Sequence, residues 1–123
     1  KVICERYTAA FANDPRFIDS QFKDDRRESC YHLYMLRIAK ATEAQRDAII
    51  TAIAQREVSV NVHFIPLPML SYYKGQGFRM DDFPNTYKLF STEISLPVYY
   101  DLTDAQVDEV ITAVKAAVGE VMG

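Results

Sequence analysis

The chain has 123 residues, of which 49% are hydrophobic and 25% are charged, and its formal net charge is −3. This length allows one domain with one modest core, and the composition is that of an ordinary globular protein. The scattered charges form no clustered basic face, so we expect neither a nucleic-acid partner nor an anionic-membrane partner. No apolar run approaches the roughly 20 residues that span a bilayer, and no leader pattern indicates secretion. These features predict a cytoplasmic protein.

The first residues follow a helical pattern with no capping residue in front of it. Pro15 disfavours helical geometry in the residue before it, so the helix is expected to end near residues 13–15. Because the chain also begins at Lys1 without a methionine, we expect a piece of a longer protein. The apolar stripe of this helix consists of Ile3, Tyr7, Ala10 and Phe11.

Residues 15–28 are polar and include a self-neutralising charged run, Asp24–Glu28, which predicts a solvated loop. Cys30–Ile38 is then predicted to be a strand that is apolar on both faces, as in a central strand or at a domain junction. The chain has two cysteines, Cys4 and Cys30. We expect both to be free buried thiols of a reducing compartment, and a disulfide between them stays an open alternative.

Two capping boxes mark the starts of two further helices, at Thr42–Gln45 and at Thr103–Gln106. The first helix is expected to run to about Glu57. The second is amphipathic and is expected to end at Gly119. Each cap stabilises its helix by about 1 kcal/mol.

The segments between these two helices are predicted in chain order as a strand, a loop, a short helix and a strand. Residues 58–65 alternate between apolar and polar, as in a half-covered strand, and residues 69–83 form an aromatic-rich loop. Pro84 begins a short helix over residues 84–93. Residues 94–99 form a short strand in which Pro97 indicates a sheet edge. The whole order predicts an α+β fold, with about three strands in a short antiparallel or mixed sheet covered mainly on one side by helices.

No catalytic constellation is visible in the chain. It has two histidines, lacks the HExxH, CxxC and GxSxG motifs, and has no metal-ligand spacing. No lysine stands in a context that would desolvate it for Schiff-base chemistry. The aromatic- and proline-rich segment 63–100 nevertheless predicts substrate or interface contacts. The alternative is a second small core under a long loop.

Four short motifs in the second half occur in an order and spacing typical of one family. They are His63-Phe64-Ile65-Pro66-Leu67, Tyr72-Tyr73-Lys74, Asp82-Phe83-Pro84-Asn85 and Glu93-Ile94-Ser95-Leu96-Pro97-Val98-Tyr99. This succession resembles the end of DegT/StrS-type sugar aminotransferases, and residues 29–34 are similar to the first strand of their small domain. The resemblance covers essentially the whole chain and is most specific from Val58 to Val114.

The resemblance implies that residues 1–123 are the carboxy-terminal small domain of a fold-type I enzyme that depends on pyridoxal 5′-phosphate. The cofactor, its aldimine lysine and the aspartate on the pyridine nitrogen would belong to a large domain outside this chain. The parent would move an amino group, usually from glutamate, onto a nucleotide-linked keto-sugar for cell-surface polysaccharides or related sugars. A few relatives dehydrate their substrate instead. The parent would be a homodimer, and this domain alone would be inactive.

The same resemblance implies candidate substrate contacts. His63, Phe64, Ile65 and Pro66 match the family segment that lines the sugar-nucleotide side of the cleft, where His63 could donate to a hydroxyl or phosphate oxygen. Tyr72 and Tyr73 would contact substrate or the second subunit, and Arg37 would anchor a carboxylate or a phosphate. The alternatives are a structural role for His63 and a snorkelling or edge-paired Arg37. His32 is expected to pack at the domain junction.

An autonomous α+β ligand-binding or regulatory module is the alternative to an aminotransferase domain. An independently active enzyme would need a catalytic group that the sequence does not show. A domain that docks on a larger one is expected to expose an apolar patch, here around Tyr31, Met35 and residues 64–73. A wholly polar surface there would contradict the domain interpretation.

Overall fold

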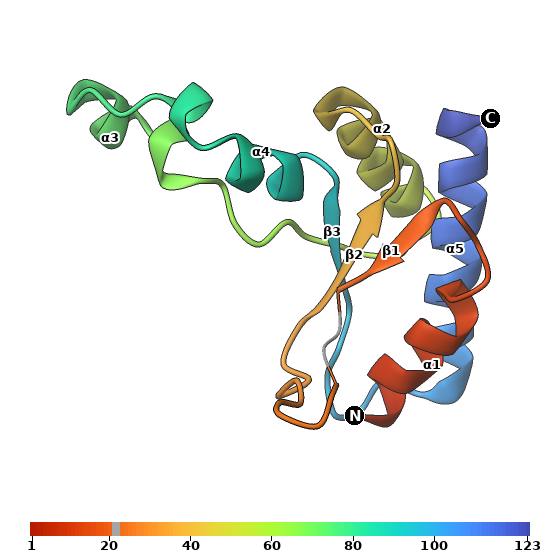
Figure 1. The fold of residues 1–123 in the computed structure, drawn as a ribbon. Helices are drawn as coiled ribbons and strands as arrows, with labels where there is room; N and C mark the ends of the chain where they lie inside the picture. Colours follow the sequence, from red (N-terminus) through yellow and green to blue (C-terminus); the bar gives the residue numbers. More distant parts are fainter. Residues whose placement is uncertain (21–22) are drawn as a thin grey trace.

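The structure, a computed structural model, describes residues 1–20 and 23–123, and a three-stranded antiparallel sheet organises its fold (Figure 1). The strands lie in the order β1 (Phe17–Asp19), β2 (Tyr34–Ile38) and β3 (Glu93–Leu96). In this register Ile18 lies beside Arg37, and Arg37 lies beside Glu93. The sheet and its helices confirm the expected α+β fold with about three strands.

Three helices cover one face of the sheet (Figure 1). They are α1 (Val2–Phe11), α2 (Glu43–Ala54) and α5 (Asp104–Met122), and α5 packs against both of the others. The strand side chains that point toward these helices form the core together with the apolar stripes of the helices. The strands contribute Phe17, Tyr34, Leu36, Ile38, Ile94 and Leu96 to it.

The other face of the sheet carries alternate residues of the same strands and is not covered by these helices. β2 shows this alternation, since Tyr34, Leu36 and Ile38 are buried while Met35 and Arg37 are only half-buried. The prediction of a strand buried equally on both faces and beginning at Cys30 was therefore wrong. The central position of this strand in the sheet is confirmed, and so is the edge position of the strand that precedes Pro97.

Two further strand predictions were wrong. Residues 58–65 do not form a strand, because only Asn61 pairs with the sheet, through its bridge to Ser95 on β3. The predicted 15–28 loop instead contains β1, whose three residues are too few for a periodic signal in the sequence. The charged run Asp24–Glu28 in this segment is exposed, as expected.

The helix predictions were more accurate, because capping chemistry is local. Both capping boxes are formed, with the Thr42 and Thr103 hydroxyls accepting from the amides of Gln45 at 3.2 Å and Gln106 at 3.3 Å. The short helix begun by Pro84 is α4 (Pro84–Phe90). The predicted loop 69–83 contains α3 (Ser71–Gly75) between two 3₁₀ turns, η1 (Leu67–Met69) and η2 (Met80–Asp82).

α5 does not end at Gly119 but continues to Met122. A helix-ending glycine adopts a left-handed conformation, and here Gly123 has the positive φ of 84° while Gly119 stays helical. α2 ends at Ala54, earlier than the predicted Glu57.

The expected burial of Cys30 was wrong, and neither Cys30 nor His32 lies in the predicted strand. Cys4 is buried and Cys30 is exposed, and both are free thiols. His32 is exposed on this chain, and its packing at a domain junction stays a prediction. Both differences have one cause: the strand begins at Tyr34, so residues 30–33 lie in a surface segment instead of the sheet.

Replacing Thr103 by alanine tests the capping box of α5. We expect the free energy of unfolding to fall by about 1 kcal/mol, because the Gln106 amide loses its side-chain acceptor. Urea unfolding measures this change. Thr112→Ala is the control, since Thr112 is exposed on the same helix and bonds only the Asp108 carbonyl four residues earlier; it should change stability by less than about 0.5 kcal/mol. Equal losses in the two variants would contradict a specific capping role.

Candidate functional site

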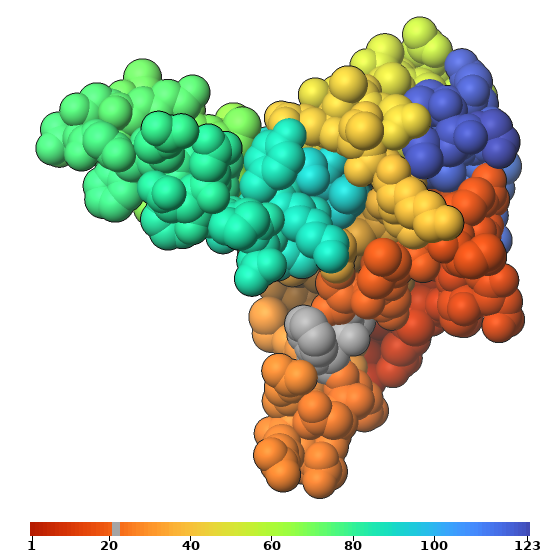
Figure 2. All heavy atoms as spheres, turned by 45° about the horizontal axis from the view of Figure 1, so that its top comes forward, coloured from red at the N-terminus to blue at the C-terminus, as the bar shows by residue number. Residues whose placement is uncertain are grey.

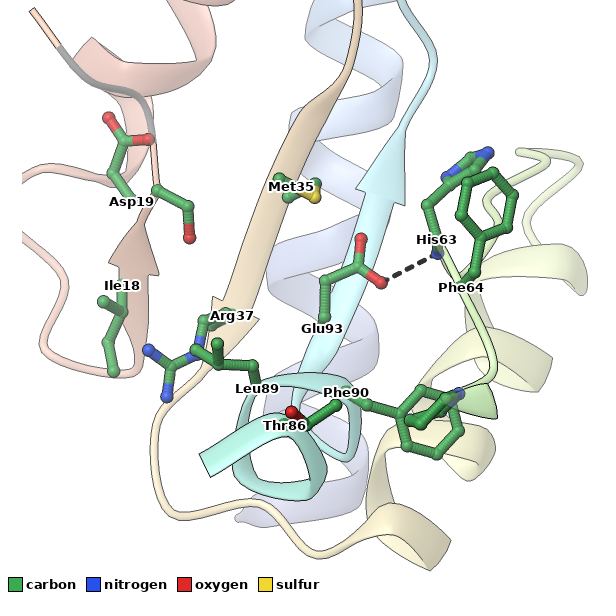
Figure 3. A pocket seen from close by; sticks show the side chains of 12 residues that line it. Ile18, Asp19, Met35, Arg37, His63, Phe64, Thr86, Leu89, Phe90 and Glu93 are labelled. Carbon is green, nitrogen blue, oxygen red and sulfur yellow. Dashed lines mark hydrogen bonds between the residues drawn. The ribbon is translucent and has the colours of Figure 1, made fainter. Parts of the chain in front are cut away.

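A pocket of about 540 Å³ lies on the outer face of the sheet, opposite the helical layer (Figure 3). The strands form its floor, the segment after Asn61 forms one wall, and α4 forms another. Its described lining residues are Ile18, Asp19, Ser20, Met35, Arg37, His63, Phe64, Pro66, Thr86, Leu89, Phe90 and Glu93. The pocket therefore combines residues from five separate parts of the chain.

The strand register explains why polar groups face this pocket. Arg37 pairs with Ile18 on one side and with Glu93 on the other, so the three side chains leave the sheet on the same face. A cation and an acid from neighbouring strands thus stand over the floor of the pocket. Glu93 is only 6% exposed, whereas Arg37 is half-buried.

Arg37 is held in place by a hydrogen bond to a side chain. Its Nε donates to the Thr92 hydroxyl at 3.2 Å. Figure 3 shows its guanidinium beside Ile18 and Leu89, which also line the pocket. A guanidinium has five N–H donors, so the terminal nitrogens of Arg37 retain the geometry to bind a carboxylate or a phosphate.

Glu93 lies at the start of β3, and its carboxylate accepts two hydrogen bonds. The buried Ser95 hydroxyl donates to Oε1 in a short contact, and the His63 backbone amide donates to Oε2 at 3.1 Å. Burial raises the pKa of the Glu93 carboxyl above its usual value, and the bonds from Ser95 and His63 offset this only in part. Glu93 thereby joins the wall of the pocket to its floor (Figure 3).

His63, Phe64 and Pro66 form the wall that leaves the sheet edge. The rings of His63 and Phe64 lie edge to face with their centroids 4.8 Å apart. Among the side-chain nitrogen and oxygen atoms of the described residues, Nδ1 of His63 is buried and has no hydrogen-bond partner. A buried polar atom without a partner carries a desolvation cost, and at this position the cost falls on the ring that forms part of the pocket wall.

Arg46 holds α4, the helix that forms one wall of the pocket, in place. This α2 residue is 2% exposed, and its Nη1 donates to the carbonyls of Phe90 at 2.6 Å and Glu93 at 3.1 Å. Its guanidinium also lies 4.8 Å from the centroid of the Phe90 ring. Arg46 therefore ties the end of α4 and the start of β3 to the helical layer.

Residues 64–83 project from the body of the domain, and we call them the arm (Figure 2). A hollow of about 290 Å³ at the base of the arm is lined by Leu67, Pro68, Tyr73, Phe78, Phe83 and Thr86. The arm exposes many apolar side chains among its polar ones, namely Phe64, Ile65, Leu67, Leu70, Tyr72, Phe78 and Phe83. This confirms the expected apolar patch over residues 64–73, whereas Tyr31 and Met35, expected in the same patch, are half-buried.

The pocket brings together four of the predicted substrate contacts, Arg37, His63, Phe64 and Pro66. The other three do not line this pocket: Ile65 and Tyr72 are exposed on the arm, and Tyr73 lines the smaller hollow.

The sequence analysis missed Glu93 and Arg46. Each had a detectable signal, since Glu93 directly precedes an apolar strand and Arg46 lies on the same helical stripe as Ile49 and Ile53. A charged residue on the buried face of a helix or strand needs hydrogen-bond or ion-pair partners. Such a residue therefore indicates a position where several parts of the chain meet.

The pocket does not contain the residue that would bind pyridoxal phosphate covalently. Among the described residues that line it, none is a lysine. Lys115 lies over the Phe11 ring at 5.8 Å, on the helical side of the sheet. The described pocket residues therefore do not fit the role of aldimine former. Within the described part of the chain, no three His, Cys, Asp or Glu side chains come together as a metal site, and no helix is long and apolar enough to cross a bilayer.

Comparison with known proteins decides the family. Residues 1–115 match the DegT/DnrJ/EryC1/StrS aminotransferase family. The chain belongs to this family. It is 37% identical over 116 residues to the spore coat polysaccharide biosynthesis protein SpsC of Bacillus subtilis strain 168, a match that covers 92% of this chain and 30% of SpsC. The family membership predicted from the motif order is thereby confirmed.

Solved structures of this family share the fold. Spr1654 of Streptococcus pneumoniae, assigned as a sugar aminotransferase, superposes in its PLP form with a TM-score of 0.94 at 36% identity, covering 99% of this chain and 31% of Spr1654. PseC of Helicobacter pylori, an aminotransferase of pseudoaminic acid biosynthesis, gives a TM-score of 0.79 at 20% identity over 97% of this chain and 32% of PseC, which shows the fold alone. This DegT-family chain thus spans about 30% of the length of SpsC.

Proposed function

We propose that these residues are the carboxy-terminal small domain of a pyridoxal-phosphate-dependent sugar aminotransferase, and that the outer-face pocket is one wall of its substrate cleft. The parent enzyme moves an amino group from glutamate to a nucleotide-linked keto-sugar used for cell-surface polysaccharide. It works in the cytoplasm as a homodimer. When bound, the cofactor supplies the electron sink for this exchange, and it is held by the large domain.

The open outer face of the sheet carries this proposal. A pocket of about 540 Å³ on that face joins a guanidinium, a buried carboxyl group and an imidazole ring, but has no described lysine. Such a surface can bind and orient a polar ligand, while the covalent chemistry has to come from a facing domain. An autonomous module would have to leave this pocket and the apolar arm exposed, which is unusual for a monomeric protein.

The pocket residues have distinct roles in this proposal. Arg37 binds an anionic group of the substrate through its terminal nitrogens, and His63 uses its ring to bond a hydroxyl or phosphate oxygen. Phe64 and Pro66 supply apolar contact to a sugar or base ring. Ile65, Tyr72 and Tyr73 lie on the arm and contact the large domain or the second subunit.

Turnover by the full-length protein tests the proposal. The parent chain, loaded with pyridoxal phosphate, is incubated with glutamate and a panel of nucleotide-linked keto-sugars, and 2-oxoglutarate and amino-sugar are measured. We expect equal amounts of the two products, and no turnover by residues 1–123 alone. Loss of water from the sugar without 2-oxoglutarate would indicate a dehydratase instead. A natural gene that encodes only these residues would contradict the domain assignment.

Arg37→Gln in the parent enzyme tests the anion anchor. We expect KM for the nucleotide-linked sugar to rise about 10-fold to 100-fold with a smaller change in kcat, because a hydrogen bond to a charged group contributes about 1.5–3 kcal/mol. Arg27→Gln is the matched control, since Arg27 is exposed and pairs with Asp24 at 3.1 Å, away from the pocket lining. An unchanged KM in the Arg37 variant would show that Arg37 does not bind the substrate.

A further inference from the structure

The segment after α2 leaves the sheet at one defined residue. Asn61 exchanges two backbone hydrogen bonds with Ser95 on the free edge of β3, at 3.1 Å and 2.8 Å. Continuing this antiparallel register would place His63 opposite Glu93. The His63 amide instead donates to the Glu93 side chain at 3.1 Å, so a carboxylate takes the place of the next backbone acceptor.

Donation to the Glu93 side chain, in place of the Glu93 carbonyl, changes the direction of the chain. A backbone pair would have kept residues 63–66 in the plane of the sheet as a fourth strand. The longer reach of a glutamate side chain lets His63 rise over the outer face, where His63, Phe64 and Pro66 become the wall of the pocket (Figure 3). Glu93 itself is fixed, since it is 6% exposed and the buried Ser95 hydroxyl donates to its other oxygen.

We propose that Glu93 is a positioning residue, which sets the shape of the pocket by holding the His63 amide away from the sheet edge. Its effect on substrate binding rests on the function proposed above. Its effect on the conformation of residues 63–66 does not, and the two can be tested separately.

The charged and titratable groups around this carboxyl come from four other parts of the chain. His63 and Arg46 both favour its ionised form, and Arg37 is its register neighbour on β2. Asp19, at the β1 end of the same pocket, accepts from the Thr8 hydroxyl at 2.7 Å. The α4 residues that line the pocket, Thr86, Leu89 and Phe90, carry no titratable group.

Hydrogen exchange at the His63 amide, read by NMR on the 123-residue chain, tests the positioning role. Glu93→Met keeps the side-chain volume but has no acceptor, and burial favours an apolar side chain at this position. We expect exchange at His63 to become about 10-fold to 100-fold faster in this variant, while the chain stays folded. Glu93→Gln keeps an acceptor and should restore most of the protection. Glu109→Met, at an exposed position of α5, is the control for the substitution itself.

The pH dependence of stability gives a second readout, which reports the burial of Glu93. The Glu93 pKa is raised in the folded chain, so its contribution is fully present below the unfolded value of 4.5 and is lost as the pH rises through the folded pKa. Wild type should therefore lose stability relative to Glu93→Gln as the pH increases over this range. Unchanged His63 exchange in Glu93→Met would overturn the proposal.

In the parent enzyme, Glu93→Met should raise KM for the sugar more than it lowers kcat, and Glu93→Gln should rescue KM. Faster His63 exchange without any catalytic effect would leave the positioning role intact and separate this segment from substrate binding. A wild-type parent without aminotransferase activity would contradict the proposed function alone.

Discussion

Arg46→Met is expected to lower the free energy of unfolding by about 2–4 kcal/mol, one of the largest losses available to a single substitution in this chain. The carbonyls of Phe90 and Glu93 would lose their shared donor in a buried environment, and each unsatisfied group costs about 1–3 kcal/mol. The ion pair with Asp47, at 2.7 Å, adds little, because the Asp47 side chain is 62% exposed. Urea unfolding monitored by circular dichroism measures the loss.

Two variants show whether this loss comes from the two carbonyls. Arg79→Met removes an arginine whose side chain is 73% exposed and that pairs with Asp81, and it should change stability by less than about 0.5 kcal/mol. Arg46→Lys keeps one donor group and the charge but not the planar fork, so it should fall between wild type and Arg46→Met. An Arg46→Met chain as stable as wild type would show that α4 is held by apolar contacts instead.

The helices were predictable from sequence because their signals are local. Thr42 and Thr103 are followed three residues later by glutamine, and this spacing alone specifies a capping box. The sheet was harder, since β1 has only three residues and pairs with a strand 15 or more positions away. A short stretch of sequence, of the length used to detect periodicity, therefore does not contain both strands.

The alternation in residues 58–65 shows a different limit. Val58, Val60 and Val62 have the period of a strand, and Val58 and Val60 do pack against the core. The backbone still leaves the sheet at His63, whose amide donates to the Glu93 side chain and not to the Glu93 carbonyl. Periodicity reports which side chains face the core, but it does not report where the backbone hydrogen bonds go.

The candidate site was predictable only in part for the same reason. The motif order pointed to His63, Phe64 and Pro66, which lie next to one another in sequence. Arg37 joins them through the strand register, and Glu93 and Arg46 join through contacts that span 30 and 44 residues. The resemblance pointed to the segment that forms the pocket wall, whereas the residues that hold this segment in place depend on tertiary contacts.

Phe64→Ser should have almost no effect on the isolated chain and a large effect in the parent enzyme. Phe64 is 76% exposed at the base of the arm, so its loss should change the stability of residues 1–123 by less than about 0.5 kcal/mol. If the large domain covers this surface and the cleft, the same substitution removes a buried aromatic contact there, and such a contact contributes about 2 kcal/mol or more. Unfolding of the isolated chain and of the parent, together with turnover by the parent, measures the difference.

Tyr100→Ser separates this effect from a general loss of surface aromatics. Tyr100 is 99% exposed between β3 and α5, outside the arm and the pocket, so the substitution should be neutral in both proteins. Tyr72→Ser, at a 70% exposed position on the arm, should behave like Phe64→Ser if the whole arm is a docking surface. A parent enzyme that tolerates both arm substitutions would mean that the apolar arm is not covered by another domain or subunit.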